Sequence, residues 1–191
     1  MKIVSMSGSL RENVGKKDAK ACRNSGKVPC VLYGGTDQIH FVTDEKEFKD
    51  VIFTPEVCFV DLTINEKTYR ATLKDVQYHP VSDKILHVDF LEIIESKPIV
   101  MYVPLKVTGT SPGVLRGGKL VKKMRRLKVK GLSNVLPDFI NIDISKLDIG
   151  DSTKVNQIAL EGVEFLDVAT SIVVTVLTTR GVEEAATDGK K

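Results

Sequence analysis

The chain has 191 residues, of which 42% are hydrophobic and 28% charged, as in ordinary globular proteins of one large or two small domains. It contains no run of about 18 apolar residues, and residues 1–6 are too short for the core of a signal peptide, so we expect a cytoplasmic protein with no membrane span. The three cysteines, Cys22, Cys30 and Cys58, form no Cys-x-x-Cys pair, which points to reduced thiols.

The net charge of +3 is small, but the basic residues gather in two segments. Residues 1–35 carry seven basic and two acidic groups, and residues 116–130 carry eight basic groups and no acid. Clustered positive charge favours a polyanionic partner, because each neutralised phosphate releases counterions. A solvated, lysine-rich surface gives the same pattern. Residues 1–92 as a whole carry 13 basic and 14 acidic groups, so a grip on a polyanion has to come from the basic segment and not from the overall charge.

The first half of the chain has mainly the periodicity of strands. Apolar and β-branched stretches bounded by turn residues predict strands at 28–33, 38–42, 57–64 and 68–73, followed by an apolar run at 85–91. The third and fourth of these strands are joined by three residues, 65–67, which is the length of a hairpin loop.

Two short helices are predicted between these strands. Residues 16–25 are rich in Lys and Ala and stop before a glycine. Residues 43–52 begin with the cap-type residue Thr43, carry acids in their first turn and place Phe48 and Val51 on one face.

The second half of the chain predicts another β-rich unit. Strand patterns recur at 99–107, 127–129, 139–144 and 172–177 and are separated by Gly, Pro and Asp turn signals. Several short strands with regular turns favour a sandwich or a barrel-like domain. The predicted division of the chain is 1–92, 93–180 and a disordered tail at 181–191, which lacks apolar periodicity. The fold class is therefore mainly β.

Three stretches are more specific than this pattern. Residues 11–23 read Arg-Glu-Asn-Val-Gly-Lys-Lys-Asp-Ala-Lys-Ala-Cys-Arg, residues 26–35 read Gly-Lys-Val-Pro-Cys-Val-Leu-Tyr-Gly-Gly, and residues 77–90 read Gln-Tyr-His-Pro-Val-Ser-Asp-Lys-Ile-Leu-His-Val-Asp-Phe. In this order and spacing they resemble the bacterial ribosomal protein L-twenty-five family, including its two-domain branch, the general stress protein Ctc. Residues 112–118 and 136–151 resemble the second domain of the longer members.

The resemblance implies both a fold and a function. The first domain is expected to be a six-stranded β-barrel with short helices that binds 5S ribosomal RNA, followed by a second β-rich domain. The protein would be a structural constituent of the large ribosomal subunit and no enzyme, with no cofactor, no metal and no small-molecule substrate. It would be monomeric within the ribosome, with neighbouring large-subunit RNA and ribosomal proteins as further partners.

The family pattern of RNA contacts falls on a small set of residues in this sequence. The set consists of Arg11, Arg23, Tyr33, His87 and Asp89, with Lys16, Lys17 and Gln77 as weaker members. Three positions depart from the common family pattern: Lys20 stands where many members have Arg, Cys22 where Leu is common, and Cys30 where Ala is usual. These departures concern details of the basic segment and its neighbouring strand.

The chemistry of these side chains suits RNA. His87 and Asp89 are two residues apart, so in an extended strand they lie on the same face of a sheet. An Asp accepts hydrogen bonds only, which is costly beside a polyanion unless it meets donors such as a guanine amine, a 2′-hydroxyl or an Arg. Asp89 is therefore expected to contribute to specificity.

Two alternatives use the same sequence. One is a stress-regulated RNA-binding protein that associates with ribosomes only conditionally. The other is a small β-barrel metal-binding protein or enzyme that uses His79, Asp83, His87 and Asp89, although no metal-binding or nucleophile motif supports it.

The second basic segment supplies a further expectation. Its cations Lys122, Lys123, Arg125 and Arg126 are expected to face ribosomal RNA or an acidic neighbour, on the charge distribution alone.

Overall fold

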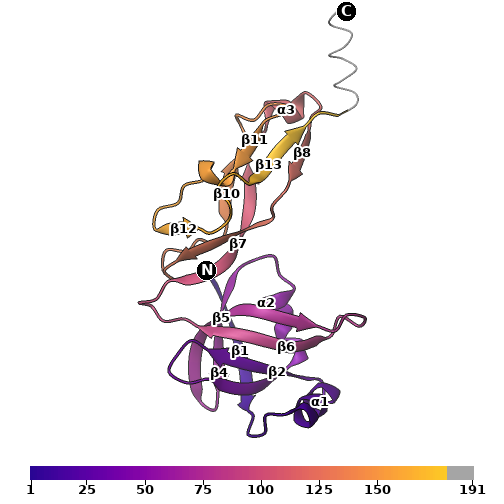
Figure 1. Ribbon diagram of the computed structural model, residues 1–191, viewed down its shortest axis with the longest axis vertical. Coiled ribbons are helices and arrows are strands. Elements are labelled where there is room, and N and C mark those ends of the chain that lie inside the picture. Colours follow the sequence, from indigo (N-terminus) through magenta and orange to yellow (C-terminus); the bar gives the residue numbers. More distant parts are fainter. Residues whose placement is uncertain (180–191) are drawn as a thin grey trace, which may run out of the picture. The chain divides into compact units, whose positions relative to one another are not determined.

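The computed structural model describes residues 1–179 and divides the chain into two compact units, Met1–Ile99 and a second unit that begins at Val100 (Figure 1). The first unit contains a closed six-stranded barrel and the second is also β-rich, which confirms the predicted fold class. The predicted tail at 181–191 lies outside the described residues. Within residues 1–179, no helix combines the length and the apolar character that a membrane crossing requires.

The barrel has the strand order β1-β3-β2-β6-β5-β4. Its strands are β1 Lys2–Leu10, β2 Lys27–Tyr33, β3 Ile39–Asp44, β4 Cys58–Ile64, β5 Lys67–Tyr78 and β6 Ile85–Glu92. Parallel pairing between β1 and β4 closes the barrel, and a closed sheet has no free edge at which another chain can add.

β1 is the barrel strand that is missing from the predicted strands. Val4, Met6 and Leu10 alternate with serines, as in a strand with one apolar face, but Met6 is the only residue of the strand that is fully buried. Gly8 lies so close to the Phe41 ring that an added Cβ would be 2.6 Å from Cδ2 of the ring. The small residue therefore allows β1 to pack against the core.

Three aromatic rings occupy the centre of the barrel core. Phe41, Phe48 and Phe90 are fully buried, and the ring centroids lie 5.9 Å apart for Phe41–Phe90 and 6.4 Å apart for Phe48–Phe90. Aromatic rings bury large apolar areas and stabilise a core most at such separations. This cluster fixes β6, which carries Phe90, against β3 and the short helix that carries Phe48.

The first predicted helix is confirmed. α1 spans Lys16–Asn24 and contacts β2. The residue Gly26 follows with φ of 76°, a left-handed conformation that favours glycine and ends the helix.

The second predicted helix is wrong at its start. The strand β3 continues to Asp44, and the helical turns that follow are η1 Glu45–Phe48 and α2 Lys49–Ile52. Thr43 pairs with Val28 of β2, so the strand ladder takes the residue that the sequence offers as a helix cap.

The β4–β5 hairpin has a shorter turn than predicted. Ile64 pairs with Lys67, which leaves only Asn65 and Glu66 in the turn. Both turn residues have positive φ, 44° and 70°, as a two-residue type I′ turn requires.

The second unit contains two separate sheets, with strand orders β10-β7-β9-β12 and β11-β13-β8, instead of a closed barrel. Its strands are β7 Ile99–Thr108, β8 Lys119–Lys122, β9 Arg126–Gly131, β10 Ile140–Asp143, β11 Ser152–Lys154, β12 Val163–Phe165 and β13 Ile172–Leu177, and its helical turns are α3 Pro112–Leu115 and η2 Val155–Gln157. The four predicted strands correspond to β7, β9, β10 and β13. The strands that the sequence pattern does not predict, β8, β11 and β12, have only three or four residues each.

Candidate nucleic-acid interface

The predicted contact residues on strands lie together on the outer face of the barrel, where β2, β6 and β5 are neighbours. Gln77 of β5 pairs with His87 of β6. Tyr33 of β2 pairs with Leu91 of β6, two residues beyond Asp89. Strand pairing thus brings four of the predicted residues, which come from three different strands, onto one surface.

His87 and Asp89 contact each other on this surface. They flank Val88, which is fully buried, so both side chains face outward. Nδ1 of His87 lies 2.7 Å from Oδ1 of Asp89, and the two side chains are 28% and 29% exposed. When the Nδ1 proton is donated to Asp89, Nε2 of the neutral ring becomes an acceptor, whereas a protonated ring donates from both nitrogens. The carboxylate therefore fixes which edge of the imidazole is available to a ligand.

Tyr33 stands at the end of β2 and is half-buried. Burial raises the pKa of its hydroxyl above the ordinary value, and the negative charges of Asp89 and Asp75 raise that pKa further. The hydroxyl thus keeps its proton and can donate a hydrogen bond.

Asp75 belongs to this surface and is missed by sequence reasoning. It pairs directly with Asp89 across β5 and β6. The register of β5 shifts on either side of it, between Leu73 and Asp75 and again between Gln77 and Tyr78. Such bulges re-aim side chains and have no reliable sequence signal, which explains the omission. Two carboxylates directly opposite each other repel, so the pair costs stability in the free protein.

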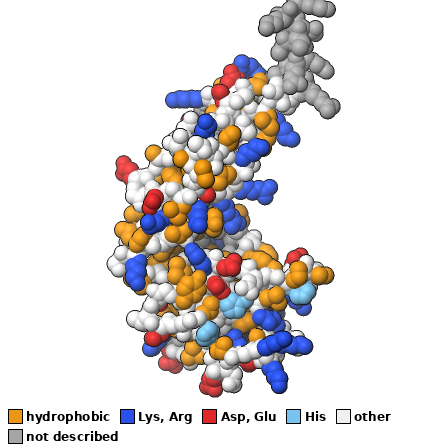
Figure 2. All heavy atoms as spheres, in the orientation of Figure 1, with side chains coloured by type: hydrophobic (Ala, Val, Ile, Leu, Met, Phe, Trp, Pro, Cys, Tyr) orange, Lys and Arg blue, Asp and Glu red, His pale blue; other side chains and the backbone are white. Residues whose placement is uncertain are grey.

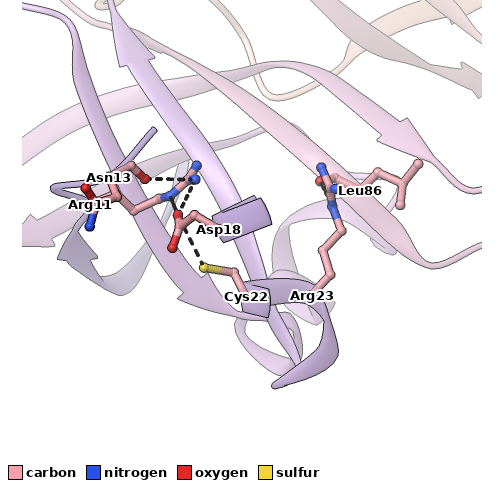
Figure 3. Close-up of polar contacts among 6 residues, drawn as sticks. All are labelled: Arg11, Asn13, Asp18, Cys22, Arg23 and Leu86. Carbon is pink, nitrogen blue, oxygen red and sulfur yellow. Dashed lines mark hydrogen bonds and ion pairs between the residues drawn. The ribbon is translucent and has the colours of Figure 1, made fainter. Parts of the chain in front are cut away.

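Arg23 connects α1 to the strand that carries His87. Its Nε donates a hydrogen bond of 2.9 Å to the carbonyl of Leu86, the residue before His87 (Figure 3). A guanidinium has five N–H donors, so this bond leaves other donors for a ligand. Arg23 is exposed and thus combines an anchoring contact with accessible charge.

The Arg11 side chain is already bound within the protein, so it is less available to a phosphate than an exposed arginine would be. Its Nη2 and Nε lie 2.6 Å and 3.1 Å from Oδ2 of Asp18 in α1 (Figure 3). The Arg11 side chain is 8% exposed and that of Asp18 is 37% exposed. The pair fastens α1 to the end of β1, and Asp18 is a second residue that sequence reasoning did not single out. Its signal in the sequence is that it is the one acid within the Lys-rich helix α1.

Lys16 and Lys17 occupy the first turn of α1 and are exposed. In Figure 2, Lys and Arg side chains gather over the end of the barrel where α1 lies in Figure 1. Gly15 is the N-cap residue of α1 and makes no side-chain cap hydrogen bond. The N-terminus of this helix therefore combines backbone N–H groups with two lysines.

His79 has a structural role in the β5–β6 turn. Its Nδ1 accepts hydrogen bonds from the backbone N–H groups of Val81, at 3.3 Å, and of Ser82, at 3.2 Å. Across residues 1–179, no group of three or more His, Cys, Asp or Glu side chains is placed to hold a metal ion. The four residues of the metal-binding alternative thus do not form a ligand cluster.

The second basic segment forms the connection from β8 to β9. Lys122 ends β8, Arg126 begins β9, and both are exposed, as are Lys123 and Arg125 between them. The Lys123 N–H donates 2.9 Å to a carbonyl of β13, and the Arg125 carbonyl accepts a 3.0 Å bond from β7. Backbone bonds to both sheets hold this segment in place.

Comparison with known proteins gives a consistent result for the whole chain. Residues 6–90 match the model of the ribosomal L25p family, and residues 98–180 match that of the C-terminal domain of ribosomal protein TL5. The large ribosomal subunit protein bL25 of Bacteroides fragilis is 46% identical over 87% of this chain and 85% of its own length. The protein of the same name from Amoebophilus asiaticus is 43% identical over 100% of both chains. That from Porphyromonas gingivalis is 39% identical over 97% of this chain and 98% of its own length.

Proposed function

This chain belongs to the ribosomal L25p family, and we propose that it is a structural, non-enzymatic constituent of the large ribosomal subunit that binds 5S ribosomal RNA. The proposed contact surface is the barrel face formed by β2, β6 and β5 together with α1. The observation that carries the proposal is the oriented His87–Asp89 pair, which lies beside Gln77 and directly follows the strand residue to which Arg23 is anchored.

The β-strand part of this surface suits the minor groove of an RNA helix. That groove is wide and shallow and displays 2′-hydroxyls and base edges. His87, with Nε2 free, can accept from a 2′-hydroxyl or, when protonated, donate to a phosphate. The Tyr33 hydroxyl donates, and the Gln77 amide both donates and accepts. These groups together match the mixture of donors and acceptors in that groove.

The carboxylates of Asp75 and Asp89 supply discrimination. They face each other and would repel a phosphate, so a ligand has to present donors to them. Guanine N2 amines and 2′-hydroxyls are such donors in an RNA minor groove. A surface that repels phosphate at its centre and attracts it at its rim selects one docking position, in which base edges or sugars meet the acids.

The rim is supplied by α1. Cations in the first turn of a helix oppose the helix dipole and cost about 0.3–1 kcal/mol each. Lys16 and Lys17 occupy this unfavourable position, and a phosphate bound there reverses the cost, because helix N-termini bind anions. We assign Lys16 and Lys17 to phosphate contacts, Arg23 to a contact beside His87, and Arg11 to the positioning of α1 through Asp18.

The second unit would contribute less specific contacts. Lys122, Lys123, Arg125 and Arg126 are exposed on a connection that backbone bonds hold in place, which suits attraction to neighbouring ribosomal RNA or to an acidic ribosomal protein. The location that follows from this proposal is the ribosome in the cytoplasm, with one copy of the chain in each particle.

The decisive experiment is a titration of the full chain against 5S ribosomal RNA and against an unrelated structured RNA of equal length, over a series of salt concentrations. We expect 5S ribosomal RNA to bind at least about 100-fold more tightly at moderate salt, as specific complexes do. His87→Gln should weaken the specific complex by about 1–3 kcal/mol and leave the unrelated RNA unaffected. Equal affinity of the wild-type chain for both RNAs would refute the proposal.

A second measurement addresses occupancy. Quantification of the chain in large subunits from growing and from stressed cells distinguishes constant from conditional association. A constant stoichiometry of one per subunit is expected. Occupancy that rises only under stress would favour the conditional alternative and leave the RNA-binding surface unchanged.

A further inference from the structure

We propose that the outer face of the four-stranded sheet in the second unit is a separate RNA-binding site. It would take unpaired bases by stacking them on Tyr102 and hold their phosphates with cations of β7 and β9. This site uses no residue of the barrel, and so it does not depend on the proposed binding of 5S ribosomal RNA.

The geometry begins with β7, which is flanked by β10 and β9 in the sheet. Met101 and Val103 are buried, so Tyr102 between them faces outward, and its side chain is 56% exposed. Lys106 lies four residues further along the same face and pairs in register with Asn141 of β10. A tyrosine that is more than half exposed in an inner strand is a flat apolar platform with no cover.

The neighbouring strand β9 supplies a row of cations. Leu127 and Val129 are fully buried, so the alternating residues Arg126, Lys128 and Lys130 face outward. Consecutive same-face residues on a strand are about 7 Å apart, close to the spacing of phosphates along an extended nucleic-acid strand. Arg126 also ends the exposed basic segment 122–126, so positive charge continues from that connection onto the sheet.

A second ring lies beside β7 at the β10 edge of the face. Phe139, which precedes β10, is 43% exposed, and Nζ of Lys106 lies 4.9 Å from its ring centroid. An ammonium over an aromatic ring is held by the ring quadrupole, which keeps the lysine on this face. This face of the sheet thus presents two aromatic rings, Tyr102 and Phe139, and the ammonium of Lys106 lies over the second of them.

Two acids stand at outward positions of the strands of this face. Glu164 of β12 pairs with Lys130 at 3.2 Å, and Asp143 accepts both the N–H and the hydroxyl of Ser145. Neither of these two acids forms an ion pair with Lys106, Arg126 or Lys128, so cations outnumber acids at the outward positions of β7, β9, β10 and β12. Figure 2 shows Lys and Arg side chains next to hydrophobic ones on the second unit.

Unpaired RNA is the partner that uses both features. Cations alone fit any polyanion, but an exposed ring adds binding only for a ligand with a flat π-face to stack on it. Bases inside a duplex are stacked on each other and cannot reach the ring, whereas loop or single-stranded bases can. An acidic protein segment would use the lysines and leave Tyr102 without a role.

The test measures binding of a fluorescent oligouridylate of about ten nucleotides to the full chain, with an RNA duplex and a poly-glutamate peptide as competitors. Tyr102→Ala should weaken oligouridylate binding about 5- to 150-fold, the range expected for loss of one stacked base. Tyr102→Phe keeps the ring and should stay within about twofold of wild type. Phe53→Ala removes an aromatic side chain of the first unit that is 69% exposed and should change nothing.

Three outcomes overturn the proposal: unchanged affinity for Tyr102→Ala, equal loss for Tyr102→Phe, or displacement of the labelled oligouridylate by the duplex or by poly-glutamate as effectively as by unlabelled oligouridylate. In wild-type protein, the Tyr102 ring resonances should shift on titration, which provides a readout free of folding effects. A failure of the barrel proposal would appear separately, as equal affinity of the wild-type chain for 5S ribosomal RNA and for the unrelated RNA. That result does not depend on the effect of Tyr102→Ala on oligouridylate binding.

Discussion

The two units use their polar side chains in different ways. On the barrel face the functional groups are bound to one another: Arg11 to Asp18, Arg23 to a strand carbonyl, and His87 to Asp89. On the second unit most cations are exposed, although Lys130 pairs with Glu164 across two strands of the sheet face and Arg116 pairs with Asp148. Groups fixed before binding lose little entropy when a ligand arrives, so they can select one geometry. Exposed lysines attract many polyanions equally. We therefore expect the barrel to select one docking geometry, and the second unit to select only for unpaired bases, through Tyr102, among the polyanions that its lysines attract.

The two units also differ in where their backbones adopt positive φ angles. Among residues 1–179, the non-glycine residues with positive φ are Asn65, Glu66 and Asp83, and all three belong to the barrel. In the described part of the second unit, positive φ occurs only at glycines. The barrel therefore tolerates local strain that its closed sheet can hold, whereas the open sheets use the residue that adopts such turns without strain.

The largest expected effect tests whether the two units are energetically separate. Phe90→Ala removes the ring that contacts both other core phenylalanines and should lower the free energy of unfolding of the barrel by about 3–5 kcal/mol. Leu127→Ala, at a fully buried position of β9, should lower that of the second unit by about 2–5 kcal/mol. Hydrogen exchange resolved by residue would show each loss confined to its own unit. Loss of protection in both units after either change would contradict the division.

The next effect separates positioning from phosphate contact on α1. Arg11→Ala should weaken binding of 5S ribosomal RNA by about 1–3 kcal/mol, because Asp18 loses its charged partner and α1 its attachment. The slope of affinity against salt should stay the same. Lys17→Ala should instead reduce that slope by about one. Titrations at several salt concentrations measure both.

Lys49→Ala is the matched control for this pair, because Lys49 is an exposed lysine on α2 and outside the proposed surface. It should alter neither affinity nor slope. A reduced slope for Arg11→Ala would show that Arg11 leaves Asp18 to bind phosphate, which would make the barrel face less preorganised than its free geometry suggests.

Part of the fold and part of the site could be predicted from the sequence. Apolar and β-branched stretches predict β2 and β4. The alternation of side chains along a strand puts His87 and Asp89 on one face, where their 2.7 Å contact confirms it. The resemblance in the motifs predicted the closed barrel, which composition alone does not indicate. β1 is not among the predicted strands, although Val4, Met6 and Leu10 alternate with serines, because three serines and a glycine give the stretch the composition of a loop.

The rest of the site depends on three-dimensional detail. Asp75 faces Asp89 because two bulges shift the register of β5, and nothing in the local sequence marks those bulges. Arg11 has the residue type of a phosphate ligand, but its pairing with Asp18 depends on how α1 docks. The RNA-contacting roles of these residues stay predictions, because the geometry describes the free protein.

A smaller effect tests the contrast in backbone strain. Glu66→Gly should stabilise the barrel by about 1 kcal/mol, because a left-handed residue with a side chain costs about 1–2 kcal/mol that glycine avoids. Gly150→Ala should destabilise the second unit by a similar amount, since its φ is +92° and nothing lies within 4 Å of an added Cβ. Thermal or chemical unfolding measures both. If both substitutions stabilised their unit, or both destabilised it, the positive φ angles would not mark the sites of backbone strain.

The smallest effect concerns acid stability of the second unit. Hydrogen bonds from the hydroxyl and the N–H of Ser145 lower the pKa of Asp143 below its ordinary value of 3.8. The stabilisation from this carboxylate is therefore complete above about pH 3.8 and is lost as the pH falls through the lower folded pKa. Ser145→Ala should move the pKa of Asp143 back toward 3.8 and leave that of Asp148, which is lowered by the Ile149 N–H and by Arg116, unchanged. Carboxyl resonances followed against pH measure the two values independently. If Ser145→Ala moved the pKa values of Asp143 and Asp148 together, the two carboxylates would be electrostatically coupled. The local hydrogen bonds would then not be the main cause of each shift.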